Sequence, residues 1–254
     1  MDIRKGKYIF PNLCTLGSIF FGLYAVISTA DGTPGGFLRA SFAIFMAVVC
    51  DSMDGRVARL TKTQTKFGIE LDSLADVVSF GLAPAFLLYQ KGFSEIYQGS
   101  LNPGILFSFI YLACGAMRLA RFNVMADKKG GASNYFTGLP VPVAAGTVAS
   151  IVIADHYSFN HFPGSVRCLA ISIPLLSLLM VSTVKYRSFK KTGFTRRFVL
   201  SSLLLVLALI FIGIKSNAAT AVLSGFMFYI FLGPAEYLYK FFTKRLHEKQ
   251  EEIL

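Results

Sequence analysis

Charged residues are scarce in this 254-residue sequence, where they make up only 15 % of the chain. A soluble domain carries roughly 25 % charged residues because its surface has to interact with water. The shortage therefore excludes an ordinary soluble protein. Hydrophobic residues account for 54 % of the chain and are gathered into long runs without charge.

Cysteines are also few, and their spacing excludes two common uses of this residue. The four cysteines, at positions 14, 50, 114 and 168, all lie within or at the end of apolar runs. None forms a CxxC pair or a cluster with histidine, so neither a disulfide framework nor a zinc site is indicated. A reactive thiol is the alternative, but small residues facing lipid or protein explain the pattern better.

The apolar runs are long enough to cross a membrane as helices. Six of them approach the ~20 residues that a spanning helix needs. They cover residues 8–30, 100–117, 135–154, 168–184, 198–214 and 216–235. Two further spans, 37–53 and 72–89, are interrupted by acidic residues. Because a spanning segment must satisfy its own backbone hydrogen bonds, the sequence predicts an all-α integral membrane protein with about eight transmembrane helices.

The basic residues sort between the two sides of this predicted bundle. Of the 25 lysines and arginines, 21 fall on one side, and the exceptions are Arg39, Lys91, Arg167 and Lys215. Since basic residues are retained in the cytoplasm, both termini are expected to be cytoplasmic. The net charge of +11 then reflects topology and attraction to anionic headgroups. No nucleic-acid partner is needed to explain it.

We expect residues 1–240 to form a single polytopic membrane domain, because no linker is long enough to separate two domains. Residues 241–254 are expected to form a charged cytoplasmic tail.

Four aspartates stand out where the second predicted span ends and the third begins. Asp51 and Asp54 are three residues apart, and Asp72 and Asp76 are four apart. On helices, each pair projects from a single face. If the two helices are antiparallel and joined by a short turn, four carboxylates converge near the cytoplasmic interface. Ionisable residues placed within membrane spans are costly and tend to mark function.

Such a cluster predicts a site for hard divalent cations. The repulsion between carboxylates is relieved by one or two such ions, and oxygen ligands favour Mg²⁺, Mn²⁺ or Ca²⁺ over zinc. Two ions at one site suit phosphoryl transfer. Gly55, Ala58 and Gly68 leave room for a substrate or a facing helix, and Arg59 offers a guanidinium fork to a phosphate.

The same residues form a spaced motif, Asp51-x2-Asp54-Gly55-x2-Ala58-Arg59-x8-Gly68-x3-Asp72-x3-Asp76. It resembles the complete signature of the CDP-alcohol phosphatidyltransferase family. The resemblance implies cleavage of a CDP-linked lipid, transfer of its phosphatidyl group to an alcohol, and release of CMP. It also implies that Asp51, Asp54 and Asp72 bind two metal ions, and that Asp76 shares a metal and acts as the base on the acceptor hydroxyl.

The resemblance further implies a nucleotide-binding set around the motif. Gly55, Arg59 and Thr65 would contact the nucleotide and its pyrophosphate, with Ala58 in the same CDP-lipid-binding set. The segment from residue 11 to 15 resembles the cytidine-facing part of the family, which assigns Asn12 and Thr15 to the CDP-lipid as well.

Other stretches favour serine as the acceptor alcohol. Residues 10–17, 118–123 and 135–142, and the context 72–84, resemble the membrane-integral, class II phosphatidylserine synthases. Sibling phosphatidylglycerophosphate synthases commonly carry tryptophan beside the first motif aspartate. This chain has Ser52 there and no tryptophan at all. The substrates implied are CDP-diacylglycerol and L-serine.

Candidate contacts for serine or a phosphate lie after the motif. Arg118 and Arg121 are three residues apart near the predicted end of a span, and Asn123 follows. They either clamp a carboxylate or phosphate or serve as ordinary basic anchors at the interface. Thr137, with Gly138, either shapes a loop over the substrate or merely precedes the next helix.

Two alternatives to serine transfer remain open from the sequence. The same chemistry could use glycerol 3-phosphate, inositol or an inositol phosphate, and the lipid could be ether-linked. A divalent-cation transporter built on the carboxylates is a remote alternative, because the later spans are largely apolar. The family resemblance implies a homodimer. We expect the protein in a prokaryotic cell (inner) membrane, with the active site at the cytoplasmic face because the basic residues gather on that side.

Overall fold

A computed structural model describes residues 3–60, 65–93, 102–129, 135–157, 165–187 and 220–234. The predicted span 198–214 and the predicted tail 241–254 lie outside these residues. So do the side chains of Ala58 and Arg59, although their backbone belongs to a described helix.

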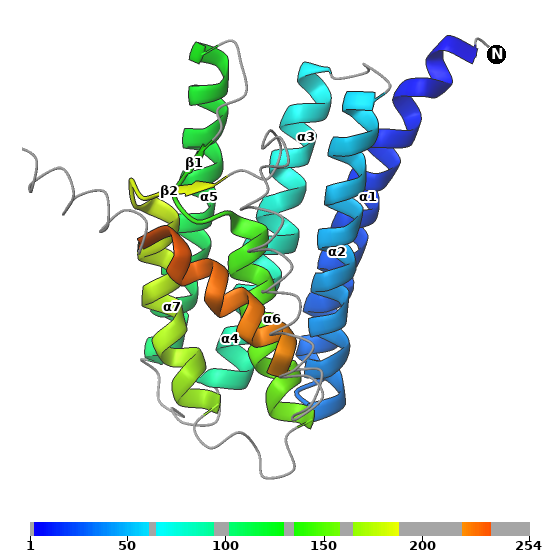
Figure 1. Ribbon diagram of the computed structural model, residues 1–254. Helices are drawn as coiled ribbons and strands as arrows, with labels where there is room; N and C mark the ends of the chain where they lie inside the picture. The colour runs from blue at the N-terminus through cyan, green and yellow to red at the C-terminus, as the bar shows by residue number, and fades with distance from the viewer. Residues whose placement is uncertain are drawn as a thin grey trace, which may run out of the picture.

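The first two helices form a long antiparallel pair (Figure 1). Helix α1 covers Ile3–Ala30, and α2 covers Pro34–Leu60. Gly32 makes the tight turn between them with φ of 65°, a backbone conformation that glycine adopts without steric cost. The Thr33 hydroxyl accepts a hydrogen bond from the Gly36 amide at 3.0 Å, and Pro34 begins α2, where its missing N–H costs little.

The third span is a continuous helix of three parts. Helix α3 covers Lys66–Asp76, a π-helical turn η1 covers Val77–Leu82, and α4 covers Ala83–Gly92. Thr65 caps α3, because its hydroxyl accepts from the Gly68 amide at 3.0 Å. The π turn packs tightly against α1: a Cβ atom on Gly22 would lie 2.8 Å from the Ser79 Cα atom. Only glycine allows the two backbones to come this close.

The remaining helices complete the bundle. Helix α5 covers Pro103–Lys129, α6 covers Val141–Tyr157, and α7 covers Ser165–Val181. A further helix covers Thr220–Pro234 and is drawn in orange in Figure 1. Two three-residue strands, β1 (Tyr135–Thr137) and β2 (Lys185–Arg187), pair antiparallel with Phe136 opposite Tyr186. This ribbon is a small exception to the predicted all-α fold.

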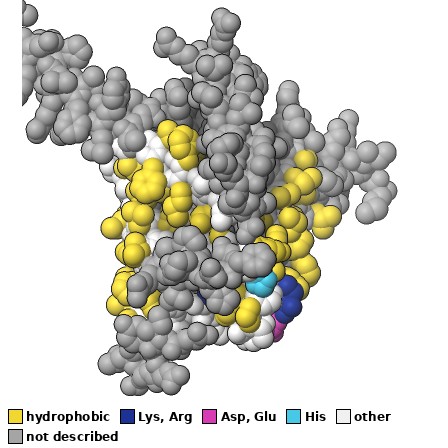
Figure 2. Space-filling model, turned by 60° about the horizontal axis from the view of Figure 1, so that its bottom comes forward, with side chains coloured by type: hydrophobic (Ala, Val, Ile, Leu, Met, Phe, Trp, Pro, Cys, Tyr) yellow, Lys and Arg dark blue, Asp and Glu magenta, His cyan; other side chains and the backbone are white. Residues whose placement is uncertain are grey.

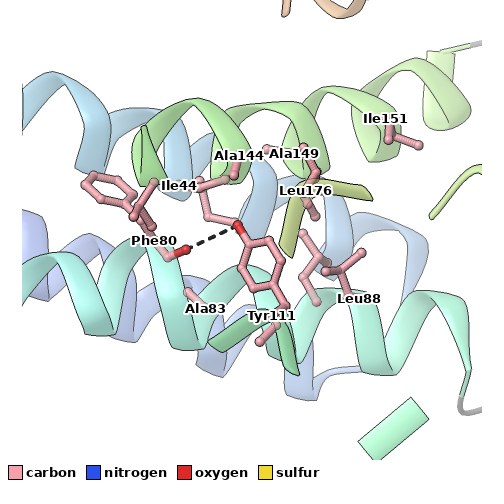
Figure 3. Close-up of a cluster of buried hydrophobic side chains, with 14 of the residues drawn as sticks. Ile44, Phe80, Ala83, Leu88, Tyr111, Ala144, Ala149, Ile151 and Leu176 are labelled. Atoms are coloured by element: carbon pink, nitrogen blue, oxygen red, sulfur yellow. Dashed lines mark hydrogen bonds between the residues drawn. The ribbon is translucent and has the colours of Figure 1, made fainter. Parts of the chain in front are cut away.

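Helix α6 lies at the centre of the hydrophobic core. Its residues from Ala144 to Asp155 are all buried, because α2 and α7 pack against it. The core around it includes Ile44, Phe80, Tyr111 and Leu176 from four other elements (Figure 3). A helix that is apolar on every side is expected at the middle of such a bundle.

The predicted membrane protein is confirmed in its helical architecture. Four helical segments are long and apolar enough to cross a bilayer: Asn12–Ala30, Pro34–Gly55, Lys66–Gly92 and Pro103–Met125. Three shorter apolar helices accompany them, at Val141–Tyr157, Leu169–Val181 and Thr220–Pro234. Hydrophobic side chains cover much of the described surface that Figure 2 shows, as lipid contact requires. The total of eight spans and the side of each terminus stay predictions.

Candidate active site

Three aspartates lie close together, one on α2 and two on α3, the helices whose places Figure 1 shows. One carboxylate oxygen each from Asp51, Asp72 and Asp76 lies within 4.8 Å of the others. The helical spacing explains part of this, since Asp72 and Asp76 are one turn apart on α3 and share one face of it, and α1 packs against both α2 and α3. Aspartates from two different helices thus form one acidic cluster.

The fourth motif aspartate, Asp54, lies beside this cluster. It is buried, and its Oδ2 atom accepts a hydrogen bond from the Thr15 hydroxyl of α1 at 2.7 Å. It also interacts electrostatically with Asp76, as do Asp51 and Asp72. The structure thus brings three of the four carboxylates into one group, and Asp54 is held beside them by Thr15 of α1.

These residues fit a divalent cation. The Oδ1 atom of Asp76 is buried and has no hydrogen-bond partner among the described residues. A buried carboxylate oxygen without a partner is costly, and it is relieved by a proton donor or a metal ion. An all-oxygen donor set of carboxylates suits Mg²⁺, Mn²⁺ or Ca²⁺.

Two of the residues assigned to the CDP-lipid, Asn12 and Thr65, lie near Gly68 at the beginning of α3. A Cβ atom on Gly68 would lie 3.2 Å from the Thr65 hydroxyl and 3.6 Å from the side-chain oxygen of Asn12. Asn12 of α1 and Thr65 thus approach Gly68 from two sides. Gly55 and the backbone of Ala58 and Arg59 follow Asp54 on α2. A side chain at Gly68 would therefore lie against both Asn12 and Thr65.

Arg118 of α5 is the basic residue that interacts with Asp76. It is 7 % exposed, and it interacts electrostatically with Asp76. Its guanidinium carbon lies 5.9 Å from the centre of the Phe122 ring, and its Nε atom is buried without a hydrogen-bond partner among the described residues. A buried guanidinium with an unpaired donor is suited to bind an anionic group of a substrate.

Arg121, in contrast, binds the protein backbone. Its two terminal nitrogens donate to four carbonyl oxygens, at 2.7 Å for Val181, 3.0 Å for Thr137, 3.2 Å for Met180 and 3.2 Å for Ser182. These bonds join α5 to the end of α7 and to β1. Because backbone carbonyls bind the Arg121 guanidinium, its geometry supports a structural role.

Asn123 and Thr137 also contribute to this framework. The Asn123 amide donates to the Ser73 hydroxyl at 2.9 Å, which joins α5 to α3 directly beside Asp72. Thr137 contributes its backbone carbonyl to Arg121. Among the four residues that the sequence offered for serine or phosphate, Arg118 is the one that the structure brings to Asp76.

Sequence reasoning missed an aromatic pair near Arg118. Tyr229, on the Thr220–Pro234 helix, interacts electrostatically with Arg118 and stacks on Tyr186 of β2 at 5.8 Å between ring centres. The Tyr186 hydroxyl donates to the Ile230 carbonyl at 3.3 Å. Tyrosine near the end of an apolar span is the signal that could have drawn attention to Tyr229, but it does not indicate a neighbour more than a hundred residues away.

The fold and the site together define a class of protein: a helical membrane protein with a cluster of carboxylates suited to divalent metal. Residues 8–232 match the family described as CDP-alcohol phosphatidyltransferase, and the chain belongs to this family. The family depends on divalent metal, in agreement with the acidic cluster.

Similar proteins come from bacteria and archaea. The CDP-diacylglycerol–serine O-phosphatidyltransferase of Helicobacter pylori (strain ATCC 700392 / 26695) is 36 % identical over 237 residues, covering 91 % of this chain and 92 % of the relative. The protein of that name from Methanocaldococcus jannaschii is 35 % identical over 196 residues, covering 77 % and 82 %. The archaetidylserine synthase of Methanothermobacter thermautotrophicus is 36 % identical over 178 residues, covering 69 % and 68 %. Apolar helices and these relatives indicate a prokaryotic membrane protein.

Proposed function

We propose that this protein transfers the phosphatidyl group of CDP-diacylglycerol to the hydroxyl of L-serine and releases CMP. The observation that carries the choice of serine is Arg118, a buried guanidinium beside the Asp76 carboxylate with a donor that has no protein partner among the described residues. The names of the relatives, which specify serine transfer, support the same acceptor.

The reaction follows from where these groups lie. The serine hydroxyl oxygen forms a bond to the lipid-side phosphorus, the bond from that phosphorus to the CMP oxygen breaks, and CMP leaves with the bonding electrons. Asp76 accepts the hydroxyl proton, as a positioned general base. Asp51, Asp54, Asp72 and Asp76 would hold the divalent cations, whose charge stabilises the oxygens of the pyrophosphate.

The other assignments concern the two substrates. Asn12, Thr15, Gly55, Ala58, Arg59 and Thr65 bind the CDP-lipid on the α1 and α2 side of the cluster. Arg118 binds the serine carboxylate, which orients the hydroxyl toward Asp76. A carboxylate removed from water needs such a fixed cationic partner, and glycerol offers no group for it.

Several finer assignments belong to the same proposal. Two ions, Mg²⁺ or Mn²⁺, occupy the cluster, and residues 1–240 form one catalytic membrane domain that works as a homodimer. The active site opens to the cytoplasmic face of the cell membrane, where the basic residues gather.

A panel of acceptor alcohols tests the proposal directly. Detergent-solubilised protein is supplied with CDP-diacylglycerol, Mn²⁺ or Mg²⁺, and either L-serine, glycerol 3-phosphate, inositol or inositol phosphate. We expect CMP release with serine and a serine phospholipid by mass spectrometry, with Asp76→Asn as the control for enzyme-dependent release. Preferred use of a phosphorylated acceptor or of inositol would refute serine transfer while leaving the family chemistry intact. CDP-archaeol, tested in parallel, distinguishes ester-linked from ether-linked lipid.

A further inference from the structure

The π-helical turn η1 leaves a backbone carbonyl without its usual partner. In an α-helix the carbonyl of residue 80 accepts a hydrogen bond from the N–H of residue 84. Residue 84 is proline, which has no N–H. The Ala83 amide instead donates to the Val78 carbonyl, five residues earlier, as in a π-helix. An α-helical register therefore offers the Phe80 carbonyl no N–H at residue 84.

Tyr111 of α5 supplies this donor. Its hydroxyl donates to the Phe80 carbonyl at 3.3 Å (Figure 3), and the Tyr111 side chain is completely buried. The two elements also touch at the next residue, since a Cβ atom on Gly81 would lie 2.8 Å from Leu112 Cδ1. Helix α5 is thus joined to η1 by one directed bond and by a close contact between Gly81 and the Leu112 side chain.

The bond from Tyr111 to Phe80 lies close along the chain to the two residues that the proposed function places at the acceptor. Asp76 comes one helical turn before Phe80, immediately in front of η1, and Arg118 comes two turns after Tyr111 on α5. On the opposite side, the Ser79 hydroxyl donates to the Ser18 carbonyl of α1 at 2.8 Å. The π turn is therefore held by α1 on one side and by α5 on the other.

We propose that Tyr111 is a positioning residue for the transfer reaction: its hydroxyl replaces the donor that Pro84 lacks and holds η1 in the register that aims Asp76 at the acceptor beside Arg118. Tyr111 does not touch either substrate. π-Helical turns within longer helices are often found at functional sites. The inference rests on the proposed function, because it assigns Asp76 and Arg118 to the two sides of the acceptor.

Tyr111→Phe tests the inference, since it removes the hydroxyl and keeps the ring. We expect kcat to fall about tenfold, because a small misplacement of a reacting group is costly, while KM for CDP-diacylglycerol and for serine change less than twofold. The matched control is Thr147→Val, which removes a buried hydroxyl that donates to a backbone carbonyl of α6 at 2.8 Å. A similar loss of Tm in both variants, with reduced kcat only in Tyr111→Phe, supports the inference. Equal kcat in the two variants overturns it.

Pro84→Ala provides a second test, because alanine returns an N–H to the turn. We expect the effect of Tyr111→Phe on kcat to shrink to less than twofold when it is measured in the Pro84→Ala background. If the full tenfold effect persists there, the hydroxyl does not act through the missing donor and the inference is wrong. The wild-type protein is first assayed with the acceptor panel, and all variants are measured with the alcohol that it uses. Failure of serine as acceptor is thereby separated from failure of the role of Tyr111.

Discussion

Asp76 differs from the other motif aspartates in its surroundings, because its Oδ1 atom is buried without a hydrogen-bond partner among the described residues and it interacts with the Arg118 charge as well as with the other carboxylates. Replacing it with asparagine keeps the size of the side chain but removes its ability to accept a proton. We expect Asp76→Asn to lower kcat by at least ~10²-fold, the usual contribution of a positioned base, with CDP-lipid binding largely retained. The measurement is CMP release at saturating serine together with the Kd of the CDP-lipid. Turnover near that of the wild type would refute Asp76 as the base.

The two arginines of α5 have the same charge but different partners, and this contrast makes a matched pair of variants. Arg118→Lys replaces a fork of donors by a single ammonium, so we expect KM for serine to rise roughly ten- to a hundredfold, which corresponds to about 1.5–3 kcal/mol for hydrogen bonds to a charged group. Arg121→Lys removes bonds to four carbonyls and should lower Tm without a selective effect on serine.

Steady-state kinetics in both substrates distinguish the roles of these arginines. If Arg118→Lys raises KM for CDP-diacylglycerol instead, its partner is the pyrophosphate. If neither KM changes, Arg118 is an anchor at the interface and serine binds elsewhere.

At the scale of secondary-structure elements, the connection from β1 to α6 depends on one glycine. Gly138 has a φ of 79°, and a Cβ atom there would collide with the Met180 carbonyl oxygen and lie 2.8 Å from Arg121 Nη2. We expect Gly138→Ala to destabilise the protein by about 1–3 kcal/mol, the usual cost of forced overpacking. The control is Gly32→Ala, which shares a positive φ of 65° but has nothing within 4 Å of the added atom.

Thermal unfolding in detergent, followed by circular dichroism, compares these two glycine variants. A larger loss of Tm for Gly138→Ala is expected. Equal losses would mean that the backbone conformation alone, and not the contact with α7, requires glycine at position 138.

At the scale of the whole molecule, a cation bound to the acidic cluster would link α2 to α3, because it relieves the repulsion between their carboxylates. A cation held by Asp51 on α2 and by Asp72 and Asp76 on α3 binds only the folded arrangement, so it should raise Tm as its concentration rises. We expect Mn²⁺ or Mg²⁺ at a hundred times its Kd to stabilise the wild type by roughly 2.7 kcal/mol, and a chelator to remove this gain.

Asp51→Ala is the control for the effect of metal on stability. It should abolish both the increase in Tm and the CMP release, with poor rescue by added metal. An unchanged metal-dependent increase of Tm in this variant would place the cation elsewhere in the protein.

The membrane class, seven of the apolar helices and the family were all predictable from the sequence, because they depend on local composition and spacing. Uncharged runs such as 100–117 predict a spanning helix wherever they occur, and two aspartates four residues apart share a helix face in any bundle. The resemblance in the motif from Asp51 to Asp76 is likewise a matter of spacing, and the match of residues 8–232 confirms the family. The count of eight spans and the orientation of the termini stay predictions.

Only the tertiary structure decided which of two similar residues faces the site. Arg118 and Arg121 are alike in sequence, but one lies beside Asp76 and the other binds carbonyls near the end of α7, about sixty residues later in the chain. Tyr111, Tyr186 and Tyr229 likewise acquire their roles from partners on other helices. The physical reason is that apolar periodicity reports burial of a residue but not the identity of its neighbour. That identity is set by helix packing. Pro84 lacks an N–H, and only the packing of the helices shows which residue of another helix supplies a donor in its place.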